Sequence, residues 1–173
     1  DCGGSCREAR CRLPWPPSGA ERSVLVDLAR VHVIAGKGGR GSVSFRREKY
    51  VPKGGPDGGN GGPGGSVWFR VNRHMRTLLD CREAPRYRAD NGGSGSGNNS
   101  TGRTGKDLVV WVPPGTVVKD LDGQPLADLI AEGDEFLAAR GGRGGRGNAR
   151  FRSSRNQAPR RADPGEAGEE RVL

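Results

Sequence analysis

Hydrophobic and polar residues alternate in several short stretches of the chain, beginning near Val24. A two-residue period is typical of a strand that has one buried face. It appears in ARVHVIAG (29–36), SVWFRV (66–71) and DLVVWV (107–112), while SVSFRR (42–47) and DEFLAAR (134–140) read as further strands. Asp122-Gly123, between GTVVKDL and QPLADL, predicts a tight hairpin turn.

The predicted strands are short and separated by turns, and no amphipathic helix of useful length is evident. This pattern is typical of an all-β fold, a small β-barrel or sandwich. Residues 1–22 show no periodicity and end in a proline cluster. We therefore expect residues 1–23 to be an unstructured extension or linker and residues 24–173 to form one domain.

Glycine is concentrated in tracts between the strands. Four tracts hold 23 of the 31 glycines: residues 36–41, 54–65, 91–105 and 141–147. Within two of them glycine recurs every third residue, the period of a polyproline-II helix, in which glycine lets neighbouring chains approach closely. The pattern predicts left-handed segments packed side by side through backbone hydrogen bonds, on a β base. The alternative is a set of flexible glycine loops.

Composition makes the burial of a large core difficult. Leu, Ile, Val and Phe together fill 31 of 173 positions and the net charge is +9, values typical of a disordered chain. The positive charge comes from 24 arginines and only 5 lysines. Arginine grips phosphate bidentately and stacks on bases, so a nucleic acid is the first candidate partner. The alternative is that a GC-rich genome supplies arginines that stay solvated.

The chain carries no recognisable site for catalysis, cofactor or metal. GKGGRG (36–41) matches a dinucleotide-binding pattern, but that site needs a helix directly afterwards, and a strand is predicted there. No Walker phosphate loop occurs, and His32, which we place on the solvent side of a strand, has no second ligand or base. The four cysteines form no CxxC pair, which indicates unpaired thiols in a reducing compartment. No apolar run approaches membrane-spanning length.

Basic residues stand beside the glycine tracts, where small neighbours let both guanidinium and backbone N–H groups reach a phosphate. We predict that they are held at loop tips and bind RNA. The candidates are Arg46, Arg47, Lys49, Lys53, Arg103, Arg143, Arg146 and Arg150. A disordered RGG-type RNA-binding segment is the alternative.

Several long motifs resemble the N-terminal domain of the Obg family of ribosome-associated GTPases. They are GKGGRGSVSFRREKYVPKGGPDGGNGGPGGSV, TGRTGKDLVV, VPPGTVV, GGRGGRGNARF and PGEAGEER. The resemblance implies a β-barrel base that carries a bundle of glycine-rich polyproline-II helices. It also implies that a P-loop GTPase domain, which uses GTP and magnesium, follows in full-length members; none of its residues lie in this chain.

The resemblance further implies a docking module for the large ribosomal subunit, active in the assembly of that subunit. The basic residues named above would then contact ribosomal RNA. We expect a monomer with no membrane partner, associated with ribosomes in the cytoplasm or in a chloroplast or mitochondrion.

Overall fold

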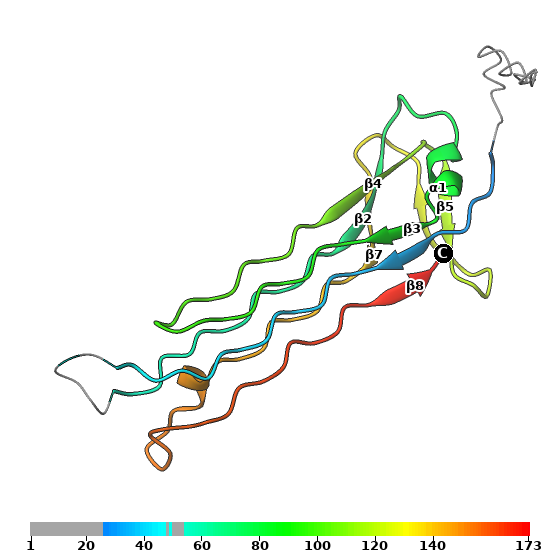
Figure 1. Ribbon diagram of the computed structural model, residues 1–173. Coiled ribbons are helices and arrows are strands. Elements are labelled where there is room, and N and C mark those ends of the chain that lie inside the picture. Colours follow the sequence, from blue (N-terminus) through cyan, green and yellow to red (C-terminus); the bar gives the residue numbers. More distant parts are fainter. Residues whose placement is uncertain (1–25, 48, 50–53) are drawn as a thin grey trace, which may run out of the picture.

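The computed structural model describes residues 26–47, 49 and 54–173. This part of the protein is elongated, with short strands gathered at one end and glycine-rich segments running side by side to the other (Figure 1). We call the end with the strands the base and the opposite end the distal end. The predicted extension over residues 1–23 lies outside the described residues.

Two three-stranded sheets and one hairpin form the base. One sheet has the order β3-β1-β8, with strands β1 (His32–Ile34), β3 (Arg86–Arg88) and β8 (Glu170–Val172). The other has the order β4-β2-β7, with strands β2 (Val67–Val71), β4 (Leu108–Val112) and β7 (Glu135–Ala139). The hairpin pairs β5 (Thr116–Lys119) with β6 (Pro125–Leu129). The helices are α1 (Leu79–Glu83) and the 3-10 helix η1 (Asn148–Phe151).

The structure confirms most of the predicted strands. The alternating stretches become β1, β2 and β4, the stretch 134–140 contains β7, and the hairpin turns at Gly123 with a φ of 78°. The strand predicted over residues 42–47 is wrong, since Phe45 makes only an isolated bridge to Pro56. Its neighbours donate and accept hydrogen bonds within the glycine-rich bundle instead of joining a sheet. Strands β3 and β8 were not predicted.

The hydrophobic core lies at the base and joins residues from both sheets and the hairpin. Val33 on β1 and Val67 on β2 are completely buried, as are the two alanines at the end of β7. Cys81 of α1 is also buried, and this burial raises the pKa of its thiol. The prediction was a small β-barrel or sandwich, and the β-rich base is confirmed, but its strands pair as separate sheets and not as one closed barrel. The base is therefore β-rich but open.

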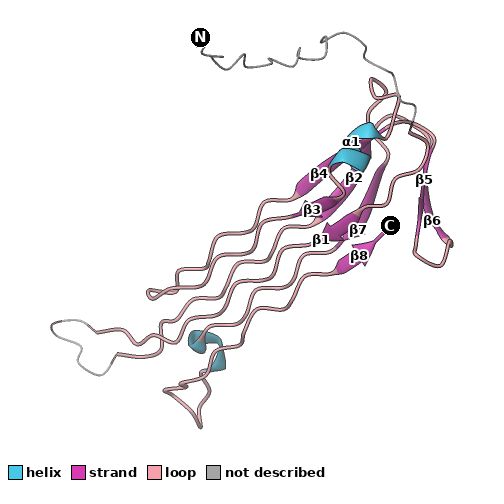
Figure 2. Ribbon diagram, turned by 45° about the vertical axis from the view of Figure 1, so that its right-hand side comes forward, coloured by secondary structure: helices cyan, strands magenta, loops and turns pink. Residues whose placement is uncertain are grey.

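Each three-stranded sheet continues into three glycine-rich segments, so that the bundle has two layers (Figure 2). The first layer, which extends β3-β1-β8, consists of segments 90–96, 36–42 and 163–169. The second layer, which extends β4-β2-β7, consists of segments 100–107, 57–65 and 140–148. Segment 163–169 was not recognised as a glycine tract in the sequence, because Gly165 and Gly168 are its only glycines.

Backbone hydrogen bonds between the segments recur every third residue. Gly36, Gly39 and Ser42 donate from their amides to carbonyls of segment 57–65 at 2.8, 2.8 and 3.0 Å. The carbonyls of the same three residues accept from amides of segment 140–148 at 2.9, 2.8 and 3.0 Å. Because buried backbone groups need such partners, this network gives the bundle an order that flexible loops lack.

Glycine is required where these segments meet. A Cβ atom added to Gly61 would lie 1.9 Å from the carbonyl oxygen of Gly39, and one added to Gly64 would lie 2.0 Å from that of Gly36. Backbone atoms cannot move away as the end of a flexible side chain can. The segments are therefore held together by direct backbone approach, which replaces the side-chain core that the composition lacks.

Candidate nucleic-acid interface

Three connections meet at the distal end of the bundle (Figure 1). The first joins segments 36–42 and 57–65, and the Phe45–Pro56 bridge closes its described part. The second is a tight turn in which Asn98 and Asn99 adopt φ values of 57° and 55°, a conformation that asparagine tolerates better than most residues. The third is the loop that runs from η1 toward segment 163–169.

Asn148, which is completely buried, ties the first and third of these connections together. Its Oδ1 accepts a hydrogen bond of 2.8 Å from the amide of Gly58. Its Nδ2 donates to the carbonyls of Ser44, at 2.8 Å, and Pro159, at 3.2 Å. One side chain thus fixes the first and third connections relative to each other, and the exposed residues that they carry are held in place.

We expect Asn148→Ala to lower the free energy of unfolding by about 3 kcal/mol, because the substitution leaves buried backbone groups without partners. Urea unfolding monitored by circular dichroism measures this loss. Asn156→Ala is the matched control, since Asn156 is exposed in the same region and should change stability by less than about 0.5 kcal/mol. Equal effects from the two substitutions would show that the Asn148 side chain does not hold the distal end together.

The third connection is rich in arginine. Residues 150–161 contain five arginines and no acidic residue. All five are exposed: Arg150, Arg152, Arg155, Arg160 and Arg161. The guanidinium of Arg161 lies 5.6 Å from the ring centre of Phe151 and 3.6 Å from the carboxylate of Asp163. Of these five, only Arg150 was predicted to bind RNA, although the density of arginine in this stretch was a signal for the others.

Four of the predicted RNA-binding residues lie at the distal end. Arg46, Arg47 and Lys49 are exposed on the first connection, and Arg150 lies in η1. Lys53, another predicted candidate, is outside the described residues. The structure therefore brings the first basic group of the sequence to the same end of the molecule as the arginine-rich loop. We give the name distal cluster to the described basic residues at this end. They are Arg46, Arg47, Lys49, Arg150, Arg152, Arg155, Arg160 and Arg161.

Arg103, Arg143 and Arg146 are exposed along the side of the bundle and not at loop tips, where they were predicted. Their carbonyls accept hydrogen bonds from neighbouring segments, with the amide of Gly93 bound to Arg103 and that of Glu166 bound to Arg143. The RGG sequence at 141–147 repeats every three residues, which is also the spacing of the hydrogen bonds between segments. Its arginines are therefore distributed along segment 140–148. The predicted set is thus divided between the distal cluster and the flank of the bundle.

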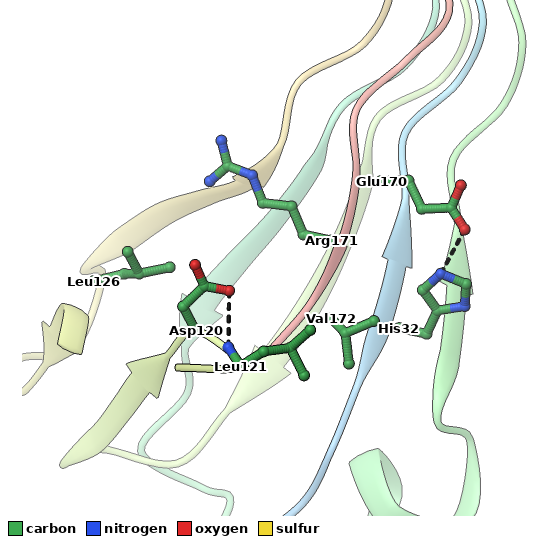
Figure 3. Close-up of a pocket in the computed structure, with 7 residues that line it drawn as sticks. All are labelled: His32, Asp120, Leu121, Leu126, Glu170, Arg171 and Val172. Atoms are coloured by element: carbon green, nitrogen blue, oxygen red, sulfur yellow. Dashed lines mark hydrogen bonds and ion pairs between the residues drawn. The ribbon is translucent and has the colours of Figure 1, made fainter. Parts of the chain in front are cut away.

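A pocket at the base lies beside β1 and β8, and His32, Glu170 and Val172 are among the residues that line it (Figure 3). There the Nε2 of His32 lies 2.7 Å from the Oε1 of Glu170, a hydrogen bond that links β1 to β8 (Figure 3). This partner of His32 was not predicted, because Glu170 is 138 residues away along the chain. In the described residues, no group of three or more His, Cys, Asp or Glu side chains is placed to hold a metal ion. No helix in that part of the chain has the length and apolar character needed to span a membrane.

Comparison with known proteins agrees with the sequence motifs. A family model described as GTP1/OBG matches residues 26–173. The chain is 56% identical over 150 residues to GTPase Obg of Persephonella marina, covering 86% of this chain and 44% of that protein. It is 58% identical over 147 residues to GTPase Obg of Prosthecochloris aestuarii, covering 84% of this chain and 45% of that protein.

The chain thus spans less than half the length of these relatives. The matched region begins with the first described residue and contains both sheets, the hairpin, all six glycine-rich segments and the distal cluster. With a family model covering most of its length and relatives above 50% identity, the chain belongs to the GTP1/OBG family.

Proposed function

We propose that this chain is the RNA-docking domain of an Obg-type GTPase that acts in the assembly of the large ribosomal subunit. The observation that carries the proposal is the distal cluster, an exposed arginine-rich surface at the end of an ordered glycine-rich bundle. Arginine binds phosphate through a planar fork of donors, and the nearby glycines leave room for a backbone to approach.

The distribution of charge supports docking through the distal end. Residues 150–161 carry five arginines and no acidic residue, whereas the hairpin region at the base, residues 120–135, has six acidic residues and no lysine or arginine. A polyanion is attracted to the arginine-rich loop and repelled from the acidic hairpin region, which favours an encounter through the distal end.

The bundle would serve as a stiff spacer between the base and the RNA. We propose that its segments are polyproline-II helices, since hydrogen bonds and inward-facing glycines both recur every third residue. A spacer fixed by backbone hydrogen bonds keeps the cations in position before binding. The entropy lost on association is then smaller than for a disordered RGG segment.

The relatives are named GTPases, and we propose that GTP hydrolysis with magnesium is carried out by a part of the full-length protein outside this chain. The 173 residues contain no Walker phosphate loop to hold nucleotide phosphates. Ribosome association in the cytoplasm, or in a chloroplast or mitochondrion, and a monomeric state belong to the same proposal.

The 173-residue chain should therefore neither bind a fluorescent GTP analogue at micromolar concentration nor hydrolyse GTP. Fluorescence anisotropy and a phosphate-release assay measure these two properties. Micromolar binding would mean that a nucleotide site exists in this chain without a recognisable phosphate loop.

The docking proposal is tested by sedimenting the chain with purified large or small ribosomal subunits at increasing salt. We expect it to sediment with large subunits and not with small ones. Because cations release counterions from phosphates, log affinity should fall with log salt by about 0.7 per contact, or roughly 4 for six contacts. Absent or equal binding to the two subunits would overturn the proposal.

A further inference from the structure

The outer face of sheet β4-β2-β7 carries large side chains that the core does not use. Val67, Phe69 and Val71 of β2 are buried, so the alternate residues Trp68 and Arg70 face outward. Across the sheet, Trp68 is paired with Val109 and Leu137, while Arg70 is paired with Trp111 and Glu135. The outer face is therefore built from two tryptophans, two aliphatic residues and an arginine–glutamate pair.

Trp111 is the most exposed of these aromatic residues, with 44% of its surface accessible. The guanidinium of Arg70 lies 5.6 Å from the centre of the Trp111 ring and also forms an ion pair with Glu135. The Trp111 ring is thus oriented by a cation that is itself fixed in place. An oriented, accessible indole of this kind is suited to stacking against another flat ring.

The same layer continues along the bundle with cationic residues. In segment 140–148, Gly142 faces the backbone of segment 163–169 and Gly144 faces that of segment 57–65. The third position of the repeat, occupied by arginine, is left to point into solvent. The exposed cations of this layer are Arg103, Lys106, Arg140, Arg143 and Arg146.

Within its own three segments, this layer has few acidic residues to balance these cations. The three segments of this layer contain only two acids, of which Asp57 is buried and Asp107 accepts a hydrogen bond from the amide of Ser66. The first layer has more acids than cations, since its segment 163–169 presents Asp163, Glu166 and Glu169. The amides of these three acids donate to the carbonyls of Arg146, Arg143 and Arg140, so the acids border the second layer along that one edge. The layer with the tryptophans is therefore the one that is complementary to a polyanion.

We propose that this outer face is a second RNA-binding surface, separate from the distal cluster, that takes an unpaired stretch of RNA. Trp111, supported by Arg70, stacks on a nucleobase, while cations of the bundle hold phosphates of the same strand. An unpaired strand is required because a base in a duplex has no free face to offer. This inference rests on the proposed RNA-docking function and adds to it a contact with a base.

The test uses the 173-residue chain and a fluorescein-labelled, 15-nucleotide single-stranded RNA of mixed sequence. Trp111→Ala should weaken binding by about 5- to 150-fold, the range found when stacking aromatic residues are replaced, and Trp111→Phe should restore most of the affinity. Ile130→Ala is the matched control, because Ile130 is 66% exposed on another part of the base and should leave the affinity unchanged. An unchanged affinity for Trp111→Ala, or equal losses for Ala and Phe, would overturn the stacking role.

Two further measurements separate this surface from the distal cluster and from any effect on folding. In a chain that also carries Arg152→Glu, Arg155→Glu and Arg160→Glu, Trp111→Ala should still weaken the residual binding by a similar factor. If the distal changes alone account for all binding, the second surface does not exist and the docking proposal stands. If neither set of changes matters, both proposals fail.

The fluorescence of Trp111 provides a test that does not require its replacement. With Trp15→Phe and Trp68→Phe, Trp111 is the remaining tryptophan of the chain. Saturating single-stranded RNA should quench its emission, because the indole stacks on a base, and a duplex of the same sequence should quench it much less. Unchanged emission with the single strand, or equal quenching by both RNAs, would overturn the proposal.

Discussion

Gly61→Ala should destabilise the domain by at least about 1–3 kcal/mol, the usual cost of overpacking. The added Cβ would lie 1.9 Å from the carbonyl oxygen of Gly39 and 2.3 Å from its carbonyl carbon. These backbone atoms belong to a segment that is hydrogen-bonded on several sides. The clash with the new Cβ can therefore be removed only if the two layers of the bundle move apart. Thermal unfolding followed by circular dichroism measures the effect.

Gly55→Ala is the matched control from the same glycine tract. Only the end of the Arg152 side chain, at 4.0 Å, lies near the position of its added Cβ. This substitution should be tolerated, or raise stability by about 0.4–1 kcal/mol through the reduced entropy of the unfolded chain. If both alanine variants melt at the same temperature as the unchanged chain, the segments are not packed as described and the glycine tracts are flexible loops.

Charge reversal in the distal cluster should abolish sedimentation with large ribosomal subunits. The variant carries Arg152→Glu, Arg155→Glu and Arg160→Glu, which lowers the formal net charge by 6, from +9 to +3. All three arginines are exposed, so the melting temperature should hardly change. We expect at least a hundredfold loss of affinity, because phosphates then meet carboxylates where they met guanidinium groups.

The control for this variant makes the same change of charge at the base. Arg30→Glu, Arg76→Glu and Arg86→Glu also replace three exposed arginines and also lower the net charge by 6. Affinity should fall far less, since these residues lie at the opposite end of the molecule from the distal cluster. Equal losses from the two triple variants would mean that overall positive charge, and not a shaped surface, determines binding.

Much of the base could be predicted from local patterns. Strands such as β2 and β4 alternate buried and exposed residues, and the Asp122-Gly123 turn has a strong local signal. Strand β3 escaped prediction because its sequence, RYR, has no apolar alternation. Strand β8 is equally short, and its pairing with β1 joins residues more than 130 positions apart. Whether the sheets close into a barrel depends on such distant pairings.

The glycine tracts were predictable as packing segments from their three-residue period, but their layer order was not. Segment 163–169 carries acidic residues at the outward positions and glycine at only two others, so its composition did not identify it as a packing segment. Whether a predicted RNA-binding residue lies at the distal end or on the side of the bundle depends on this order of segments. Arg143 and Arg146 resembled loop residues in the sequence, yet the repeat that contains them runs along the flank of the bundle.

The central claim, that the distal end docks on ribosomal RNA, is tested most directly by site-specific photo-crosslinking to large subunits. In a chain with Cys2, Cys6 and Cys11 replaced by serine, one crosslinker is attached at Ser154→Cys in the arginine-rich loop. A second variant carries it at Asp122→Cys, in the hairpin of the base; both positions are exposed. Position 154 should crosslink to RNA of the large subunit and position 122 should not. Crosslinks to that RNA from position 122 alone, or equally from both positions, would contradict docking through the distal end.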